Sequence, residues 1–118
     1  MKYLVTALLL LLSASRLLAQ AEMCTESNEL CVVQFNASFN AANEVTWLGE
    51  LSECVVYHVD ILKSPNLQKE YKIVVVPTIL ILDDGAEVAR FQANIMMMME
   101  ATREEVQESI DEIIMSKF

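Results

Sequence analysis

Four short apolar runs, rich in β-branched residues, alternate with polar segments along the chain. Runs of this length that are bounded by turn-forming residues are typical of β-strands. The tight turn Asp83-Asp84-Gly85 separates the third run from the fourth and predicts that these two form an antiparallel hairpin. The predicted strands are residues 31–35, 54–60, 78–82 and 87–91.

Three other segments carry helix signals. Asn40 is a favourable N-cap, and the apolar spacing after it predicts a helix over residues 40–51. Ser64 and Pro65 predict the start of a second helix, and Thr102 begins a capping box that opens an amphipathic last helix. The element order βαβαββα predicts an α/β fold, with a mixed four-stranded sheet and helices on both faces.

The beginning of the chain has the layout of a secretory signal peptide, with Lys2, an apolar run over residues 4–12 and a small-residue exit at Ala19. The apolar run is too short to cross a bilayer. We expect cleavage after Ala19 or Ala21, export to the periplasm or the exterior, and no stable membrane span in the mature chain. The predicted division is a signal peptide at 1–19, a polar arm at 20–30 and one domain at 31–118.

Acidic side chains dominate the charge, with 17 Asp and Glu against 8 Lys and Arg and a net charge of -9. A surface of this sign disfavours nucleic acid and anionic membranes as partners. The chain has three cysteines, which can pair in an oxidising compartment and leave one over.

Val76-Pro77-Thr78, set between two apolar runs, resembles the cis-proline turn of thioredoxins. Upstream, where thioredoxins carry Cys-x-x-Cys, this chain has Asn40 and Asn43. Thiol–disulfide exchange needs a thiolate, and asparagine cannot supply one. The resemblance therefore implies the fold of the family without its redox chemistry.

Gln34 adds a second departure from the family pattern. It stands where redox-active relatives carry a buried acid, which accepts a proton from the second cysteine, and glutamine does not ionise. The resemblance covers roughly residues 31–115 and leaves no room for the opening strand and helix of the family. It therefore implies a shortened thioredoxin-like fold.

Cys31 and Cys54 each begin a predicted strand, and the resemblance implies that these strands are parallel neighbours. Neighbouring strands lie about 4.8 Å apart, within the range of about 4.4 to 6.8 Å for the Cα atoms of a disulfide. A Cys31–Cys54 disulfide is therefore a candidate, and Cys24–Cys31 is the competing pair. Neither Cys31 nor Cys54 is at the helix start that the family uses, which favours a structural bridge or none over a catalytic one.

Met96, Met97, Met98 and Met99 form a run whose thioethers suggest a Cu(I) site. Four consecutive side chains cannot all point one way, so core filling or an adaptable contact surface is the preferred interpretation. His58, the only histidine, has no nucleophile at a recognised spacing and is interpreted as a packing or hydrogen-bonding residue. We expect neither a metal nor a cofactor.

The resemblance places a peptide-binding groove between Phe39-Asn40 and Val76-Pro77-Thr78. Phe39 would be its apolar wall, and the backbone of Val76 would clamp an extended polypeptide by strand addition. The preferred hypothesis is a redox-inactive module that binds a polypeptide client or assists its folding, rather than an enzyme.

Two alternatives stay open. One is a thiol–disulfide oxidoreductase that acts through Cys31 or Cys54. The other is a self-associating structural subunit with the four methionines at its interface.

Overall fold

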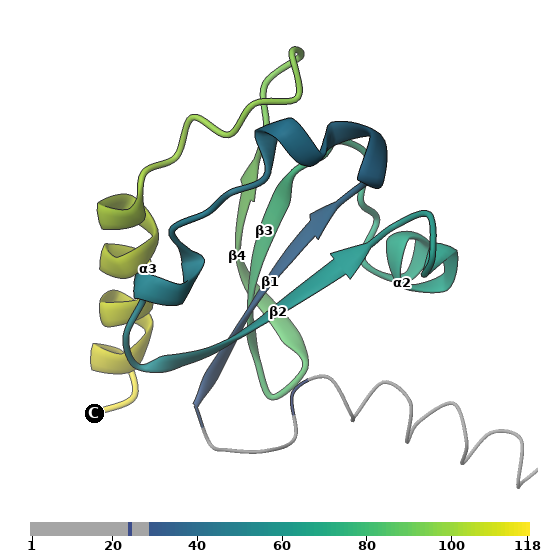
Figure 1. Ribbon diagram of the computed structural model, residues 1–118. Coiled ribbons are helices and arrows are strands. Elements are labelled where there is room, and N and C mark those ends of the chain that lie inside the picture. Colours follow the sequence, from purple (N-terminus) through teal and green to yellow (C-terminus); the bar gives the residue numbers. More distant parts are fainter. Residues whose placement is uncertain (1–23, 25–28) are drawn as a thin grey trace, which may run out of the picture.

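A computed structural model describes residue 24 and residues 29–118 of the chain (Figure 1). The predicted signal peptide and most of the predicted arm lie outside the described residues. Within the described part, no helix is long and apolar enough to cross a membrane.

The centre of the molecule is a mixed four-stranded sheet with the strand order β2-β1-β3-β4. β1 pairs in parallel with β2 and antiparallel with β3, and β3 forms an antiparallel hairpin with β4. The hairpin turn has positive φ angles at Asp84 (52°) and Gly85 (83°), the backbone region that glycine enters most easily. The strands are β1 (Leu30–Asn36), β2 (Cys54–Asp60), β3 (Thr78–Asp83) and β4 (Ala86–Gln92). All four predicted strands are confirmed to within one residue at each end.

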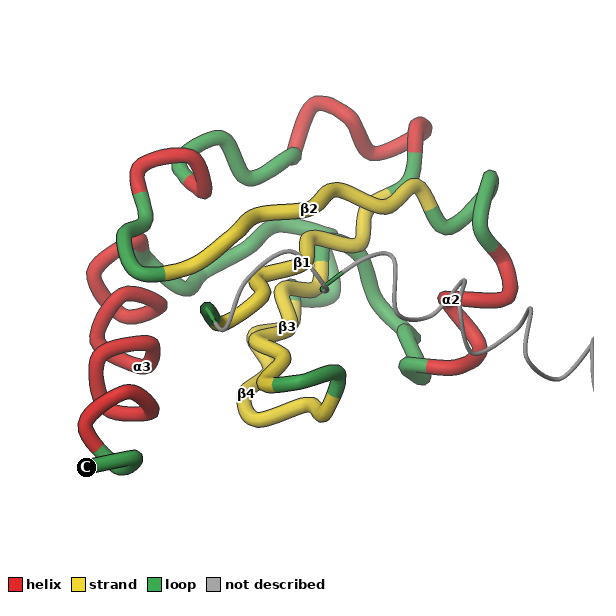
Figure 2. The backbone as a smooth tube through the Cα atoms, turned by 90° about the horizontal axis from the view of Figure 1, so that it is seen from below, coloured by secondary structure: helices red, strands yellow, loops and turns green. Residues whose placement is uncertain are grey.

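Helices cover both faces of the sheet, as Figure 2 shows. On one face, Cys31, Val33 and Phe35 of β1 pack in a core that reaches α2 (Pro65–Glu70). On the other, Leu30 and Val32 pack with Val106 and Ile110 of α3 (Arg103–Met115). This division follows from the alternation of side chains along a strand. At the start of α3, the hydroxyl of Thr102 accepts a hydrogen bond from the backbone of Glu105, as predicted.

The predicted helix over residues 40–51 is wrong. Two short 3₁₀ helices, η1 (Ser38–Asn43) and η2 (Leu48–Glu50), replace it, with a non-helical segment between them. The side chain of Gln34 binds both backbone groups of Val45. Those groups are then unavailable for an α-helix, in which each N–H and C=O must bond within the helix. The N-cap of η1 is Ala37 rather than Asn40, and no side chain caps this end.

Candidate functional site

The two asparagines at the predicted redox positions contact each other. The Nδ2 atom of Asn43 donates to the Oδ1 atom of Asn40 at 2.9 Å. Asn40 is 4% exposed and lies in η1, where its φ of -114° and ψ of 24° break the helical geometry. This pair therefore joins the first and last positions of the predicted motif by their side chains, where thioredoxins carry two thiols.

Asn40 also connects three separate segments. Its Nδ2 atom lies 3.1 Å from the Oδ1 atom of Asn36, 3.4 Å from the carbonyl oxygen of Val76 and 3.1 Å from that of Met97. The end of β1, the turn before β3 and the loop before α3 thus meet at one buried amide. An amide at a site of this kind has a structural role, because a buried polar group must find partners.

Most of the residues predicted to line the peptide groove are buried in this structure. Val76, Pro77 and Thr78 are buried together with Asn40, and of the five predicted groove residues only Phe39 is exposed. The Val76–Pro77 peptide bond is cis, and the carbonyl of Val76 is occupied by Asn40. One backbone group of the clamp expected from the sequence, the carbonyl of Val76, therefore already has a partner within the chain.

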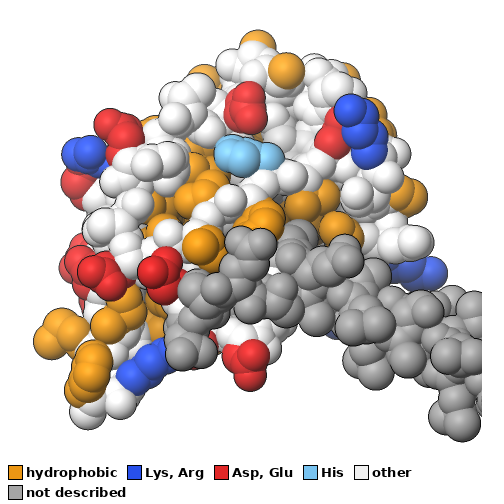
Figure 3. All heavy atoms as spheres, turned by 60° about the horizontal axis from the view of Figure 1, so that its bottom comes forward, with side chains coloured by type: hydrophobic (Ala, Val, Ile, Leu, Met, Phe, Trp, Pro, Cys, Tyr) orange, Lys and Arg blue, Asp and Glu red, His pale blue; other side chains and the backbone are white. Residues whose placement is uncertain are grey.

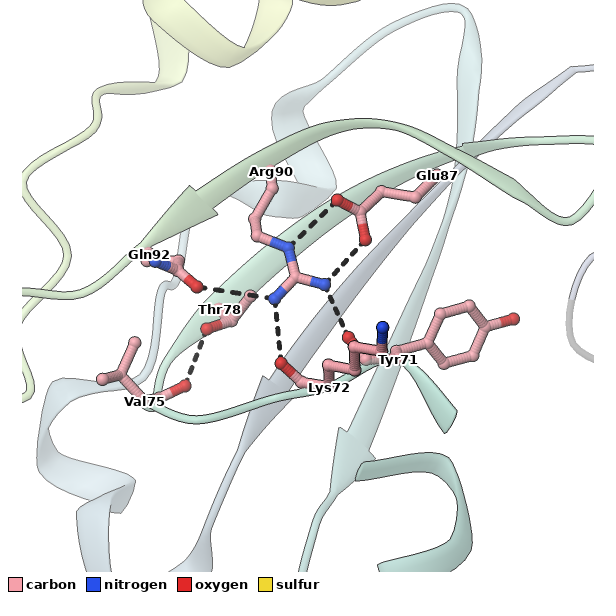
Figure 4. Close-up of polar contacts among 7 residues, drawn as sticks. All are labelled: Tyr71, Lys72, Val75, Thr78, Glu87, Arg90 and Gln92. Atoms are coloured by element: carbon pink, nitrogen blue, oxygen red, sulfur yellow. Dashed lines mark hydrogen bonds and ion pairs between the residues drawn. The ribbon is translucent and has the colours of Figure 1, made fainter. Parts of the chain in front are cut away.

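Two side chains hold this turn in place (Figure 4). The hydroxyl of Thr78 donates to the carbonyl of Val75 at 2.7 Å. The guanidinium of Arg90 on β4 donates to the carbonyls of Tyr71 and Lys72 and pairs with Glu87 at 2.7 Å. Hydrogen bonding from Arg90 lowers the pKa of the Glu87 carboxyl.

No protein-family model matches this chain, and no curated protein matches it. Among solved structures it is similar to the thioredoxin of Schistosoma mansoni, with 22% identity, a TM-score of 0.59, and 82% of this chain and 86% of that chain covered. The thioredoxin of Fasciola hepatica matches with 26% identity and a TM-score of 0.58 over 84% and 92% of the two chains. A malaria parasite thioredoxin-2, described as a component of that parasite's protein secretion machinery, matches with 18% identity and a TM-score of 0.61 over 75% and 86%.

The chain has a thioredoxin-like fold. It is a shortened form of that fold, with four described strands in a mixed sheet.

Gln34, which the sequence resemblance placed at the position of the family's buried acid, is 1% exposed. Its Oε1 atom accepts from the N–H of Val45 at 2.8 Å, and its Nε2 atom donates to the C=O of Val45 at 3.1 Å. Only a side chain with one donor and one acceptor can make both bonds, so a carboxylate does not fit here. Sequence reasoning recognised the missing acid but not the partner of the amide, which is eleven residues away in the chain.

The cysteines pair differently from the preferred candidate. A disulfide joins Cys24 to Cys31, and Cys54 is free. The Cys31–Cys54 candidate is wrong because Cys31 lies opposite Val55 in the parallel register, while Cys54 lies opposite Leu30. This offset of one residue directs the two thiols to opposite faces of the sheet.

The two cysteines of the oxidoreductase alternative, Cys31 and Cys54, lie in different surroundings. Cys31 is buried within its disulfide. Burial, and secondarily the charge of Glu29, raises the pKa of Cys54 to about 11. Catalytic cysteines need the opposite shift, because the thiolate is the nucleophile.

His58 lies on β2 beside an open pocket of about 240 Å³, and Figure 3 shows the histidine on this face of the molecule. Its Nδ1 atom is 3.3 Å from the Nε2 atom of Gln34 and 3.8 Å from a carboxylate oxygen of Glu44. The side chains of His58 and Glu44 are half exposed, so water weakens their interaction. In the described part of the chain, no group of three or more His, Cys, Asp or Glu side chains is placed to bind a metal ion.

The loop between β4 and α3 projects beside η1 at the top of Figure 1. Asn94 organises this loop, since its Oδ1 atom accepts from the backbone N–H groups of Met96 and Met98. Met99 packs towards the α3 side of the core. Ile95, Met96, Met97 and Met98 of the loop are exposed, and so is Phe39, which directly precedes Asn40, the residue bonded to the backbone of Met97. We call this set the apolar tip: Phe39, Ile95, Met96, Met97 and Met98.

The apolar tip combines two features that the sequence suggested separately. Phe39 was predicted as a groove wall, and the methionines as core filling or an adaptable surface. Ile95, which is fully exposed, was missed. Its signal was the position directly after Asn94, a residue type that favours turns.

Proposed function

We propose that this chain is an exported, redox-inactive thioredoxin-like module that binds polypeptide segments through the apolar tip. The observation that carries the proposal is the exposure of Phe39, Ile95 and Met96, at 66%, 100% and 69%, beside the bonded Asn40–Asn43 pair. Exposed apolar groups gathered in one place mark interaction sites on soluble proteins. Methionine side chains adapt to different partners, which suits a surface that accepts more than one sequence.

Export is supported by the signal-like beginning of the sequence and by the Cys24–Cys31 disulfide, a bond that persists in oxidising compartments. A redox-inactive role is supported by the raised pKa of Cys54 and by the burial of Cys31. The oxidoreductase alternative would require a low-pKa, accessible thiol.

Binding can be tested with a fluorescein-labelled, reduced and carboxymethylated protein, which stays unfolded and has no free thiols. We expect fluorescence anisotropy to report binding to the wild-type chain. The double variant Met96→Ser, Met98→Ser should bind at least about tenfold more weakly, since two buried apolar contacts of a few kcal/mol in total would be lost. Met115→Ser is the matched control, because Met115 is 74% exposed at the end of α3, away from the apolar tip.

Equal binding by the double variant and the control would refute the apolar tip as the binding surface. Redox inactivity needs a separate assay, the reduction of insulin by dithiothreitol. The chain should not accelerate this reaction. Turnover that disappears in Cys54→Ser or in Cys31→Ser would overturn this part of the proposal.

A further inference from the structure

The two edges of the sheet differ in how well they are protected. β4 carries Glu87 and Arg90, and its register with β3 shifts between Ile81 and Leu82. Charges and irregular pairing are devices that prevent edge strands from joining other strands. β2, the other edge among the described strands, has no proline or glycine, and its one Asp or Glu is its last residue, Asp60.

One hydrogen bond shows which residues of β2 direct their N–H and C=O groups towards β1 and which direct them towards the open edge. The N–H of Ile61 donates to the carbonyl of Asn36 at 2.9 Å, so Ile61 points its N–H towards β1. Alternate residues of a strand point the same way. The backbone groups of Val56 and His58 therefore point to the open edge, where no backbone group of the described residues outside the sheet bonds to them. β2 is the outermost strand in Figure 2 and runs in front of the others in Figure 1.

We propose that β2 pairs antiparallel with β2 of a second copy of this chain, around a two-fold axis at Tyr57. Tyr57 is the middle residue of the seven in β2, so this register pairs the strand along its whole length. Val56 lies opposite His58 of the second copy, and the N–H of each residue donates to the C=O of the other. The two-fold axis repeats this pair of hydrogen bonds on its other side. The two sheets become one continuous sheet.

The side chains fit the same register. Val55, Tyr57 and Val59 are half-buried on the face that α2 covers. Across the axis Tyr57 meets Tyr57, and Val55 meets Val59, which are favourable aromatic and β-branched pairs. His58 faces Val56 instead of a second His58. The Tyr57–Tyr57 and Val55–Val59 pairs favour a second copy of the chain as the partner, ahead of a client peptide or the chain's own first residues.

Cross-linking tests the axis directly. Two double variants of the full 118-residue sequence would be compared, Cys54→Ser with Tyr57→Cys and Cys54→Ser with His58→Cys. Both proteins would be recovered from the cells that express them. The two copies of position 57 form a non-hydrogen-bonded pair, whose Cα atoms are about 4.5 Å apart, a distance that a disulfide spans. The two copies of position 58 do not face each other, because they lie two residues out of register. We expect disulfide-linked dimers at least tenfold more abundant with Tyr57→Cys than with His58→Cys on a non-reducing gel. Equal yields, or no dimer with either, would overturn the proposal.

Sedimentation equilibrium gives an independent measurement. Val56→Pro removes an outward N–H that β1 does not use, so the variant should keep its circular dichroism spectrum and become monomeric. Val56→Thr keeps the N–H and a β-branched shape and should remain dimeric. A monomeric wild type at high concentration, or a dimer that persists in folded Val56→Pro, would contradict pairing through β2.

Discussion

Replacing Gln34 by glutamate tests why the buried side chain at this position is an amide and not an acid. Gln34→Glu keeps the acceptor for the N–H of Val45, at 2.8 Å, but places a carboxylate oxygen against the C=O of Val45, at 3.1 Å. Leaving a buried acceptor unpaired costs about 1 to 3 kcal/mol. Each unit by which burial raises the pKa of the new carboxyl adds about 1.4 kcal/mol above that pKa. We expect a loss of about 2 to 4 kcal/mol in the free energy of unfolding near pH 8.

The pH dependence gives the sharper test. The introduced carboxyl has a higher pKa in the folded than in the unfolded chain, so its penalty is fully present at high pH and fades as the pH falls through the folded value. A protonated carboxyl can donate to the C=O of Val45 and accept from its N–H, as Gln34 does. Near pH 5 the loss should therefore fall to about 1 kcal/mol.

Urea unfolding followed by circular dichroism at both pH values measures the effect. Gln92→Glu is the control, because Gln92 is exposed and its Oε1 atom serves as an acceptor for Arg90. The reasoning fails if Gln34→Glu loses less than about 0.5 kcal/mol near pH 8, the usual size of a surface substitution. It also fails if the loss is the same at both pH values.

Three other variants test the remaining contacts. Asn40→Ala should lower the free energy of unfolding by about 2 to 3 kcal/mol, since one buried amide joins three segments, and a loss below about 0.5 kcal/mol in urea unfolding would contradict that role. Alkylation of Cys54 by iodoacetamide at neutral pH should be at least about tenfold slower than that of a thiol with the ordinary pKa of 9.0. A pKa of about 11 leaves about 100-fold less thiolate, and the greater nucleophilicity of that thiolate offsets about half of this effect on the logarithmic scale. Ser52→Cys in a Cys54→Ser background supplies an exposed comparison, and equal rates would refute the shift. Arg90→Gln should lower the free energy of unfolding near pH 7, and this loss should shrink as the pH falls. The reason is that Arg90 holds the pKa of the Glu87 carboxyl low, and their ion pair is lost once that carboxyl is protonated. A loss that is independent of pH would count against the pair.

The sequence by itself determined the strands, the hairpin, α2 and α3. Their signals are local: β-branched runs between turn residues, Gly85 in a turn that needs positive φ, and Thr102 with its backbone partner three residues later. The absence of Cys-x-x-Cys was also a property of the sequence. Contacts over a few residues depend on neighbours that the chain itself places together, which is why these elements could be predicted.

Tertiary structure decided the rest of the site. Gln34 takes the backbone groups of Val45 and prevents the helix that the pattern of residues 40–51 favours. The parallel register separates Cys31 from Cys54 onto opposite faces. Asn40 joins the carbonyl of Val76 to the loop before α3. Each of these outcomes depends on which segments, far apart in the sequence, meet across the sheet, and hydrophobic spacing and capping preferences do not encode that meeting.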